Sequence, residues 1–355
     1  MAKLPDLILQ PTAKAIYEWY ERKSASEPGR TYLGWSELGE PCTRALWYSL
    51  RWASDKRFDG RMLRLFETGH LEEDRVLQNL RAIGCEVFSR DPQTGGQFGC
   101  SSHGGHLKGH LDAVVKGLPE APKTPHLVDV KTCNSKKFSE LLKHGMQKTY
   151  PRYWGQAQGY MGEFGLTRGM YIFICKDTDQ IHTERFEFDA EEHKRLQAKA
   201  TTVIFFPEPP ERISNDPAWF GCKFCDHRST CHATQATKIN CRTCAHATAN
   251  QSGGWSCELQ NIADLPIETQ RAGCEEHRFI PGTLMHWAEP IDADAGANWI
   301  KYRIRDTGKE FTNGRYPQHL HSQEIYDCED KEALTYMRDE DMQQLRATFD
   351  AKVVG

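Results

Sequence analysis

The sequence contains no run of about 18 to 20 consecutive apolar residues, the length that a membrane-spanning helix requires. Its first residues, MAKLPDLILQPTAKA, lack the apolar stretch and cleavage site of a secretory signal peptide. It also lacks an excess of positive charge, because 45 Lys and Arg residues stand against 49 Asp and Glu residues and give a net charge of -4. We therefore expect a soluble, cytoplasmic protein with no membrane partner, on which any surface for nucleic acid is local.

A Gly-rich phosphate-binding loop ending in Gly-Lys-Ser or Gly-Lys-Thr is absent, so the sequence carries no recognisable NTPase motor. Internal repeats are absent as well. The chain does have length, since its 355 residues, 39% of them hydrophobic and 26% charged, suffice to bury one large core or two modest ones. This composition excludes a wholly disordered chain.

Hydrophobic spacing predicts helices and strands in the first two thirds of the chain. Helices are expected over 35–83, 136–149, 151–165 and 190–205, short strands between 85 and 132, and two further strands in MYIFIC and HTERFEF. After Pro207 this periodicity stops. We predict an α/β domain over residues 1–235, a Cys-rich segment over 236–281 and an acidic α+β region over 282–355.

Two acids and a lysine stand out because they interrupt apolar, strand-like runs. Asp112 lies in GHLDAVV, and Asp129 and Lys131 lie in HLVDVKT. Alternation along a strand directs Asp129 and Lys131 to the same face of a sheet. Carboxylates hold hard divalent cations and an ammonium orients or deprotonates a water molecule, which is the apparatus of phosphodiester hydrolysis. On its own, so short a pattern also fits ordinary strand-end or solvent-facing residues.

With the motifs around them, these residues resemble the PD-(D/E)xK nuclease superfamily, specifically its RecB-type and phage-recombination exonuclease branch. Asp112, Asp129 and Lys131 match the two acid positions and the lysine position of that family. The resemblance covers about two thirds of the chain. It implies an α/β fold with a restriction-endonuclease-like core, in which helices flank a mixed sheet, and a bacterial or phage-infected cytosol as the location.

Two helical motifs extend the resemblance. Gln156 and Tyr160 in YWGQAQGYM match the family's Q-x-x-x-Y motif, which lines the DNA side of its site. Gly69 and Glu73 in ETGHLEEDRV match its first motif, G-x-x-x-(H or E). His70 lies one helical turn before Glu73 and is the competing ligand. Alone, each of these residues also fits a packed or solvated helix position.

The resemblance implies metal-dependent cleavage of DNA. One or two Mg²⁺ or Mn²⁺ ions would be held by Glu73, Asp112, Asp129 and the carbonyl of Val130. Lys131 would position the attacking water, and Gln156 and Tyr160 complete the expected catalytic set.

The segment after this lysine is basic. Residues 131–168 carry seven Lys and Arg residues against two acids, an excess that suits a phosphate backbone. The expected DNA-binding residues are Lys136, Lys137, Lys143, Lys148 and Arg152. A solvated helix face remains the alternative for each of them.

Thirteen cysteines are present, and seven of them fall between Cys222 and Cys274. In a reducing cytosol, closely spaced cysteines are more often metal ligands than disulfides. Cys222, Cys225 and Cys231 form a C-x2-C-x5-C triplet. In RecB-type nucleases with an iron–sulfur staple, such as the helicase–nuclease subunit and the CRISPR-associated adaptation nuclease, an upstream cysteine completes this triplet, and here Cys42 matches it. The resemblance implies a 4Fe-4S cluster, with zinc at the same four thiolates as the alternative.

A second cysteine set follows. Cys241 and Cys244 form a C-x2-C knuckle, and Cys257 and Cys274 are the next cysteines along the chain. Four such ligands are typical of structural zinc. His277 is an alternative ligand if one cysteine is free, as is His246.

We therefore expect a metal-dependent deoxyribonuclease, an exonuclease acting on DNA ends in recombination, repair or phage DNA processing. Two alternatives stay open: a structure-selective endonuclease or end-trimming factor, and a non-catalytic DNA-binding scaffold. The expected partners are DNA and a recombination or helicase protein.

Overall fold

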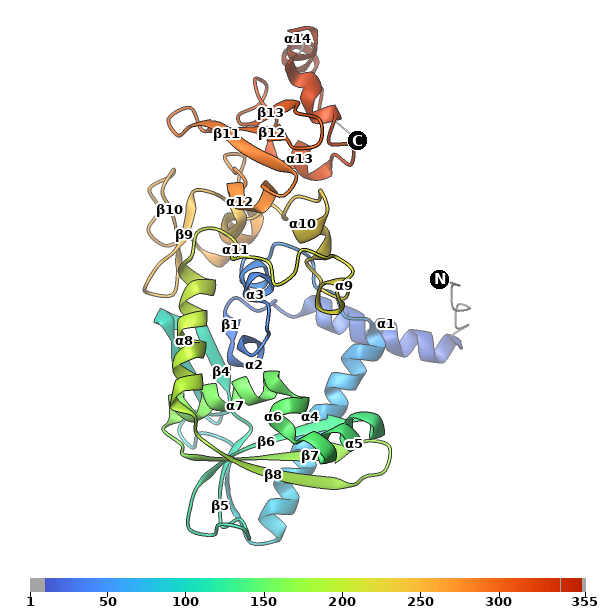
Figure 1. The fold of residues 1–355 in the computed structure, drawn as a ribbon, viewed down its shortest axis with the longest axis vertical. Coiled ribbons are helices and arrows are strands. Elements are labelled where there is room, and N and C mark those ends of the chain that lie inside the picture. The colour runs from blue at the N-terminus through green and yellow to red at the C-terminus, as the bar shows by residue number, and fades with distance from the viewer. Residues whose placement is uncertain (1–9, 339, 353–355) are drawn as a thin grey trace. The chain divides into compact units, whose positions relative to one another are not determined.

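The computed structural model describes residues 10–338 and 340–352 (Figure 1). The chain forms two compact units. The first comprises Met1–Gly39, Lys56–Ser101 and Lys108–Leu196, and the second comprises Glu40–Asp55, Ser102–Leu107 and Gln197–Gly355. Among the described residues, no helix has the length and apolar character needed to cross a membrane. The domain boundaries expected after residues 235 and 281 stay predictions.

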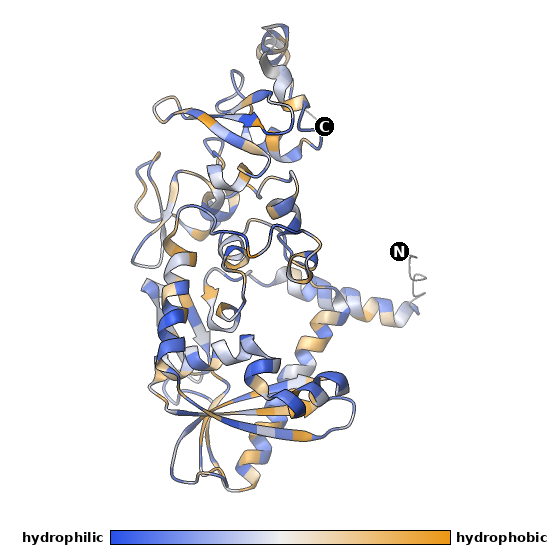
Figure 2. Cartoon of the chain, in the orientation of Figure 1, coloured by the Kyte–Doolittle hydropathy of each residue, from blue (hydrophilic) through white to orange (hydrophobic). Residues whose placement is uncertain are grey.

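A five-stranded mixed sheet forms the centre of the first unit, in the order β2-β5-β6-β7-β8. These strands are β2 (Glu86–Phe88), β5 (Ala113–Lys116), β6 (His126–Cys133), β7 (Arg168–Cys175) and β8 (Ile181–Glu187). β6 and β7 are parallel and the other pairs are antiparallel. Hydrophobic residues follow the strands of this sheet in Figure 2. Residues such as Val115, Val128 and Ile172 join Val76 and Leu77 of a long helix in one buried cluster. The predicted mixed α/β fold is confirmed.

Helices pack around this sheet. The first unit contains α1 (Pro11–Ser26), α2 (Trp35–Leu38), α4 (Gly60–Ala82), α5 (Ser135–His144), α6 (Met146–Thr149) and α7 (Pro151–Phe164). A small second sheet, ordered β1-β4-β3, is built from β1 (Leu33–Gly34), β4 (Leu107–His110) and β3 (Gly99–Ser102), with a short 3-10 turn at His103–Gly105 between the last two. The strands and helices expected between 85 and 187 are confirmed with two exceptions: the helix expected over 136–149 is divided at Gly145 into α5 and α6, and the strand expected through Asp112 is interrupted between β4 and β5. Helix α8 (Ala190–Phe205) is confirmed with the predicted bounds and runs from the first unit into the second.

The single helix expected over 35–83 is wrong. The chain forms three helices there, α2, α3 (Thr43–Leu50) and α4. Pro41 lacks a backbone N–H and disfavours a helical conformation in the residue before it, so the segment between α2 and α3 cannot stay helical. Trp52 has a left-handed backbone with φ of 53° after α3. Asp59 then restarts the helix, because its carboxylate accepts the N–H of Met62 at 2.7 Å.

The second unit contains short helices and two small antiparallel sheets. Its further helices are α9 (Phe220–Lys223), α10 (Arg228–His232), α11 (Ile267–Ala272), α12 (Pro281–Leu284), α13 (Ser322–Asp327) and α14 (Glu340–Phe349), with 3-10 turns at Cys241–Thr243 and Ala333–Arg338. Strands β9 (Ala247–Ala249) and β10 (Trp255–Cys257) form a hairpin, and β11 (Ala288–Asp294), β12 (Trp299–Ile304) and β13 (Glu310–Asn313) form a three-stranded sheet. A core that includes Phe279, Tyr302 and Phe311 fixes the last sheet.

Candidate active site and cysteine sites

Strand β6 presents Asp129 and Lys131 on one face, as strand alternation predicts. Only 2% of Asp129 is exposed, and its Oδ1 forms an ion pair with the ammonium of Lys131. Helix α7 brings Gln156 to the other carboxylate oxygen, where its Nε2 donates a hydrogen bond to Oδ2 at 3.0 Å. The buried carboxylate is therefore held between a cation and an amide donor.

Asp112 reaches the same place from a bend rather than from a strand. The residue lies between β4 and β5, where the chain leaves the β1-β4-β3 sheet and enters the five-stranded sheet. The sequence predicted that Asp112 lies within a strand. It lies in a bend because the chain passes from one sheet to another here, and the hydrogen bonds between strands are interrupted at that point. The Oδ2 of Asp112 accepts the backbone N–H of Val130 at 3.1 Å. Asp112 is thus anchored to the residue between Asp129 and Lys131.

Glu73 approaches these acids from helix α4. Burial, then the negative charges of Asp112 and Asp129, raise the pKa of the half-buried Glu73 carboxyl to about 7. Lys131 opposes this increase. His70, one turn earlier on α4, is exposed to solvent. Glu73 is near enough to Asp112 and Asp129 for their charges to act on its carboxyl, so Glu73 is the better candidate ligand of the two.

Two aromatic side chains border the acids. Tyr160 is buried on α7, and burial, followed by the charge of Asp129, raises the pKa of its hydroxyl. Gly109 on β4 makes room for it, because a Cβ at Gly109 would lie 2.7 Å from the Tyr160 hydroxyl oxygen. The Nζ of Lys131 lies 5.2 Å from the ring centre of Tyr153.

Tyr153 and Gly109 were missed from the sequence. A signal existed for Tyr153, because it precedes Gln156 by three residues and Tyr160 by seven and so shares their face of the helix. For Gly109 no local signal existed, since its constraint comes from a side chain on a distant helix.

The acids form a donor set that suits a hard divalent cation. The charges of Asp112 and Asp129 raise the cost of ionising Glu73, and a cation would offset that repulsion. Within residues 10–338 and 340–352, no group of three or more His, Cys, Asp or Glu side chains is arranged closely enough to hold a metal ion. Binding a cation would therefore have to draw the carboxylates together. The backbone carbonyl of Val130 as a ligand stays a prediction.

The five basic residues expected to bind DNA are all exposed. They are Lys136, Lys137, Lys143, Lys148 and Arg152, on or beside α5, α6 and α7. Lys137 donates a hydrogen bond to Glu140 at 2.6 Å, so part of its charge is compensated within the helix. Their predicted contact with DNA is compatible with this exposure and stays a prediction.

The first cysteine set gathers in the second unit. Cys42 is the N-terminal cap of α3, Cys222 lies in α9 and Cys231 lies in α10. Burial, then the neighbouring thiols Cys231 and Cys42, raise the pKa values of Cys222 and Cys225. All thirteen cysteines of the chain have free thiols. Four thiols are the ligand type of an iron–sulfur cluster or of zinc, but among the described residues no three cysteines are arranged closely enough to hold a metal, so both cofactors stay predictions.

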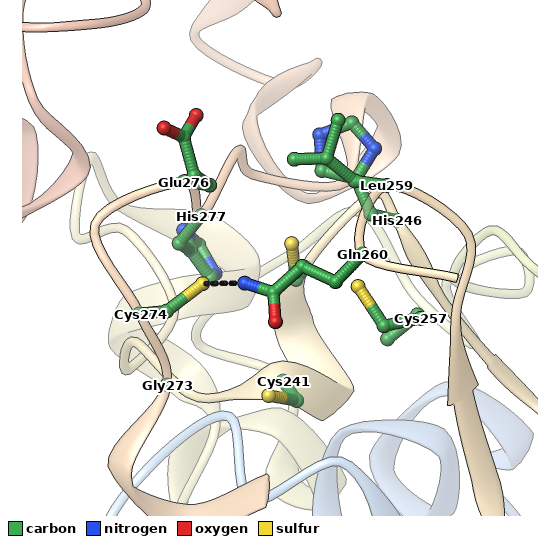
Figure 3. A pocket seen from close by; sticks show the side chains of 11 residues that line it. Cys241, His246, Cys257, Leu259, Gln260, Gly273, Cys274, Glu276 and His277 are labelled. Carbon is green, nitrogen blue, oxygen red and sulfur yellow. Dashed lines mark hydrogen bonds between the residues drawn. The ribbon is translucent and has the colours of Figure 1, made fainter. Parts of the chain in front are cut away.

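The second cysteine set lines a pocket of about 20 Å³, space enough for one water-sized particle (Figure 3). Cys241, Cys244, Cys257 and Cys274 all border it. Burial, then the other three thiols, raise the pKa of Cys241 to about 12. Cys274 is the exposed member, and its sulfur accepts a hydrogen bond from Gln260 Nε2 at 3.7 Å.

Two histidines border the same pocket. His277 is 1% exposed, its Nε2 lies 3.3 Å from the Thr243 hydroxyl, and its Nδ1 has no hydrogen-bond partner. Burial, then Arg278, lower its pKa to about 3, which keeps the ring neutral as a metal ligand must be. His246 differs because its Nε2 pairs with Asn298 Oδ1 at 2.7 Å. His277 therefore fits the alternative ligand position better than His246.

Comparison with known proteins places this arrangement in a family. The sequence model of the PD-(D/E)XK nuclease superfamily matches residues 13–232, more than half of the chain. The solved structure of SSO0001 is 17% identical with a TM-score of 0.37, over 63% of this chain and 98% of that one. The alkaline exonuclease LHK-Exo from Laribacter hongkongensis is 15% identical with a TM-score of 0.33, over 52% and 90%. A phage-related exonuclease from Haemophilus somnus 129PT is 13% identical with a TM-score of 0.28, over 55% and 81%.

A search of curated proteins finds no match. The structural similarities are too distant to assign an activity, so the family assignment rests on the match over residues 13–232, which contains Glu73, Asp112, Asp129 and Lys131. The predicted superfamily is confirmed, whereas its RecB-type branch and the iron–sulfur cluster stay predictions. The chain belongs to the PD-(D/E)XK nuclease superfamily.

Proposed function

We propose that the protein is a Mg²⁺- or Mn²⁺-dependent deoxyribonuclease that acts as an exonuclease on DNA ends. One observation carries this proposal: Asp129 is buried between Lys131 and Gln156, and Asp112 is bonded to the backbone between Asp129 and Lys131. Glu73 faces these acids closely enough for them to raise its pKa. The motif resemblance to phage-recombination exonucleases favours action at ends.

The carboxylates would hold the cation. Glu73, Asp112 and Asp129 are the proposed ligands, with the Val130 carbonyl as a fourth. A divalent ion held there would lower the pKa of a coordinated water and would stabilise negative charge on a phosphate. Gln156 donates a hydrogen bond to one carboxylate oxygen of Asp129, and the Val130 amide donates one to a carboxylate oxygen of Asp112. These bonds fix the directions in which the two carboxylates point.

Lys131 would act as a cation rather than as a base. Burial lowers the pKa of its ammonium, but Asp129 and Asp112 raise it by more, so the net pKa lies above its ordinary value. A protonated ammonium donates hydrogen bonds and cannot accept a proton. Lys131 would therefore orient the attacking water and offset charge on the phosphate, as general electrostatic stabilisation requires.

Cleavage of end-labelled linear DNA and of closed circular DNA tests the proposal. The wild-type chain should degrade linear DNA only with Mg²⁺ or Mn²⁺, and Asp129→Asn or Lys131→Met should abolish cutting while DNA binding persists. Glu86→Gln and Lys116→Met are matched controls. Glu86 lies on edge strand β2 and Lys116 on the neighbouring strand β5 of the same sheet, and both side chains are exposed. Equal cutting by Asp129→Asn and wild type would refute the proposal.

The circular substrate separates the alternatives. An exonuclease or an end-trimming factor leaves closed circles intact, whereas cut circles would exclude a strictly end-dependent enzyme and favour a structure-selective endonuclease. Wild-type protein that binds DNA but cuts neither substrate would be the non-catalytic scaffold.

We further propose that each cysteine set binds metal. Cys42, Cys222, Cys225 and Cys231 would hold a 4Fe-4S cluster, with zinc as the alternative, and Cys241, Cys244, Cys257 and Cys274 would hold zinc, with His277 as the alternative fourth ligand. Support comes from the free thiols and their mutual effect on pKa. Anaerobically purified protein should contain iron and absorb broadly at about 400 nm. A colourless preparation that contains only zinc would overturn the cluster assignment. A recombination or helicase partner stays a prediction.

A further inference from the structure

Helix α4 has one face covered by α1, although α1 itself buries no residue. The helices cross closely at Gly60, where a Cβ would collide with the backbone of Tyr17. Glu21 accepts the N–H of Gly60 at 2.8 Å, and the Tyr20 hydroxyl donates to Glu67. Gly60 and Glu67 are seven residues apart and so share this face, which Figure 1 shows at the crossing of α1 and α4.

A different face of α4 carries Glu73. Phe66 lies seven residues before Glu73 and therefore points in nearly the same direction, about 10 Å away along the helix axis. Phe66 is 42% exposed. Its ring meets that of Phe58, which is 40% exposed, edge to face with 5.0 Å between the ring centres. Two large aromatic rings thus remain partly exposed: Phe66 on the helix face that leads to the proposed catalytic acid, and Phe58, just before α4, against it.

Gly69 lies between Phe66 and Glu73 on this face. A Cβ added at Gly69 would meet nothing within 4 Å, and the residue is inside a helix, where alanine is more favourable than glycine. Packing within the chain therefore gives no reason for a glycine here. A ligand that passes over the helix would explain the glycine, because a residue without a side chain leaves room for it.

Three basic residues lie near the two rings along the chain. Lys56 Nζ lies 5.5 Å from the Phe58 ring centre, and Arg61 and Arg64 are exposed on the first turns of α4. Three acids nearby are also engaged. Asp59 caps α4, Glu67 accepts the Tyr20 hydroxyl, and Glu37 pairs with Lys56 at 3.8 Å and with Arg30 at 2.9 Å. Flat rings beside cations suit a ligand that has both planar bases and phosphates.

We propose that Phe58 and Phe66 form a base-stacking subsite for an unpaired nucleotide of the DNA strand that is cut. The inference rests on the proposed nuclease function and adds its substrate class, DNA with a single-stranded end. The distance of about 10 Å between Phe66 and Glu73 corresponds to about three stacked bases at 3.4 Å each. The subsite would hold the strand while the phosphate near Glu73 is attacked, with Gly69 leaving the path between them open.

Binding of a fluorescently labelled, single-stranded oligodeoxythymidine in EDTA tests the subsite without cleavage. Phe66→Ala and Phe58→Ala should each weaken binding by about 5- to 150-fold, the range for loss of one base–aromatic stack. Phe66→Trp should restore the wild-type affinity. Leu71→Ala is the matched control, because Leu71 is 64% exposed on α4 but on another face, and it should bind like wild type.

Kinetics provide a second measurement on single-stranded and blunt duplex DNA. Phe66→Ala should raise KM for the single strand with little change in kcat, and should affect blunt duplex DNA less. Gly69→Ala should raise the melting temperature and yet lower kcat/KM, because a methyl group narrows the path.

The results separate the two proposals. Wild-type protein that cuts DNA while Phe66→Ala binds and cuts equally well would overturn the subsite and leave the nuclease intact. Phe66-dependent binding without any cleavage would refute the nuclease and retain a single-strand-binding surface. If Phe66→Ala instead dissociated a wild-type dimer and bound DNA normally, the rings would be an interface between two copies, which also overturns the subsite.

Discussion

Replacement of Glu73 by Gln should stabilise the metal-free protein at neutral and alkaline pH. Burial, then Asp112 and Asp129, raise the pKa of Glu73 from 4.5 to about 7. Because the folded-state pKa is above the unfolded value, the folded chain binds the proton more tightly. The resulting stabilisation is fully present below about pH 4.5 and is lost as the pH rises through about 7.

The size of this effect follows from the same values. An increase from 4.5 to about 7, at 1.36 kcal/mol per pH unit, has a ceiling of about 3 kcal/mol. Glu73 is partly exposed, so screening by solvent reduces the expected difference to about 1 to 2 kcal/mol.

Urea unfolding in EDTA between about pH 5 and pH 8 measures this difference. Wild type and Glu73→Gln should have similar stability near pH 5, and the variant should be more stable at pH 8. Added Mg²⁺ should stabilise wild type more than the variant, because it binds the ionised carboxylates. Glu72→Gln is the control, since Glu72 pairs with Arg75 on the solvent side of α4. A Glu73→Gln protein that follows the wild-type curve at every pH would refute the reasoning.

Three further substitutions test separate parts of the structure. Gly109→Ala should destabilise the protein by about 1 to 3 kcal/mol and reduce cleavage, because the new Cβ would lie 2.7 Å from the Tyr160 hydroxyl oxygen. Urea unfolding measures the stability and a nuclease assay measures the cleavage. Unchanged values in both would contradict this packing. Arg346→Met should cost about 3 to 5 kcal/mol in thermal unfolding, because it leaves the buried carboxylate of Glu324 without its cation; a stable variant would exclude the buried ion pair. Cys244→Ser should reduce bound zinc by about one ion per chain in elemental analysis, and full retention would remove Cys244 from the ligand set.

Much of the fold was predictable because local pattern and tertiary structure agree in the first unit. Strand alternation in HLVDVKT correctly predicted that Asp129 and Lys131 share a face. Helical spacing correctly predicted α8. The prediction failed over 35–83, where apolar spacing favoured one helix but Pro41 and the turn at Trp52 divide it.

The site was predictable in composition and less so in geometry. Motif spacing identified Glu73, Asp112, Asp129 and Lys131, yet it placed Asp112 inside a strand rather than at the bend between two sheets. No local pattern indicates such a change of sheet. The exposure of Phe66 was equally hidden, because helical spacing does not distinguish an exposed aromatic residue from a buried one.

Crystals soaked in Mn²⁺, measured at an energy where manganese scatters anomalously, test the central claim most directly. We expect a peak in contact with the carboxylate oxygens of Glu73, Asp112 and Asp129, and its loss in Asp129→Asn. A fully occupied manganese peak elsewhere with none between these carboxylates, or a peak there that persists in Asp129→Asn, would contradict the proposed metal-dependent site.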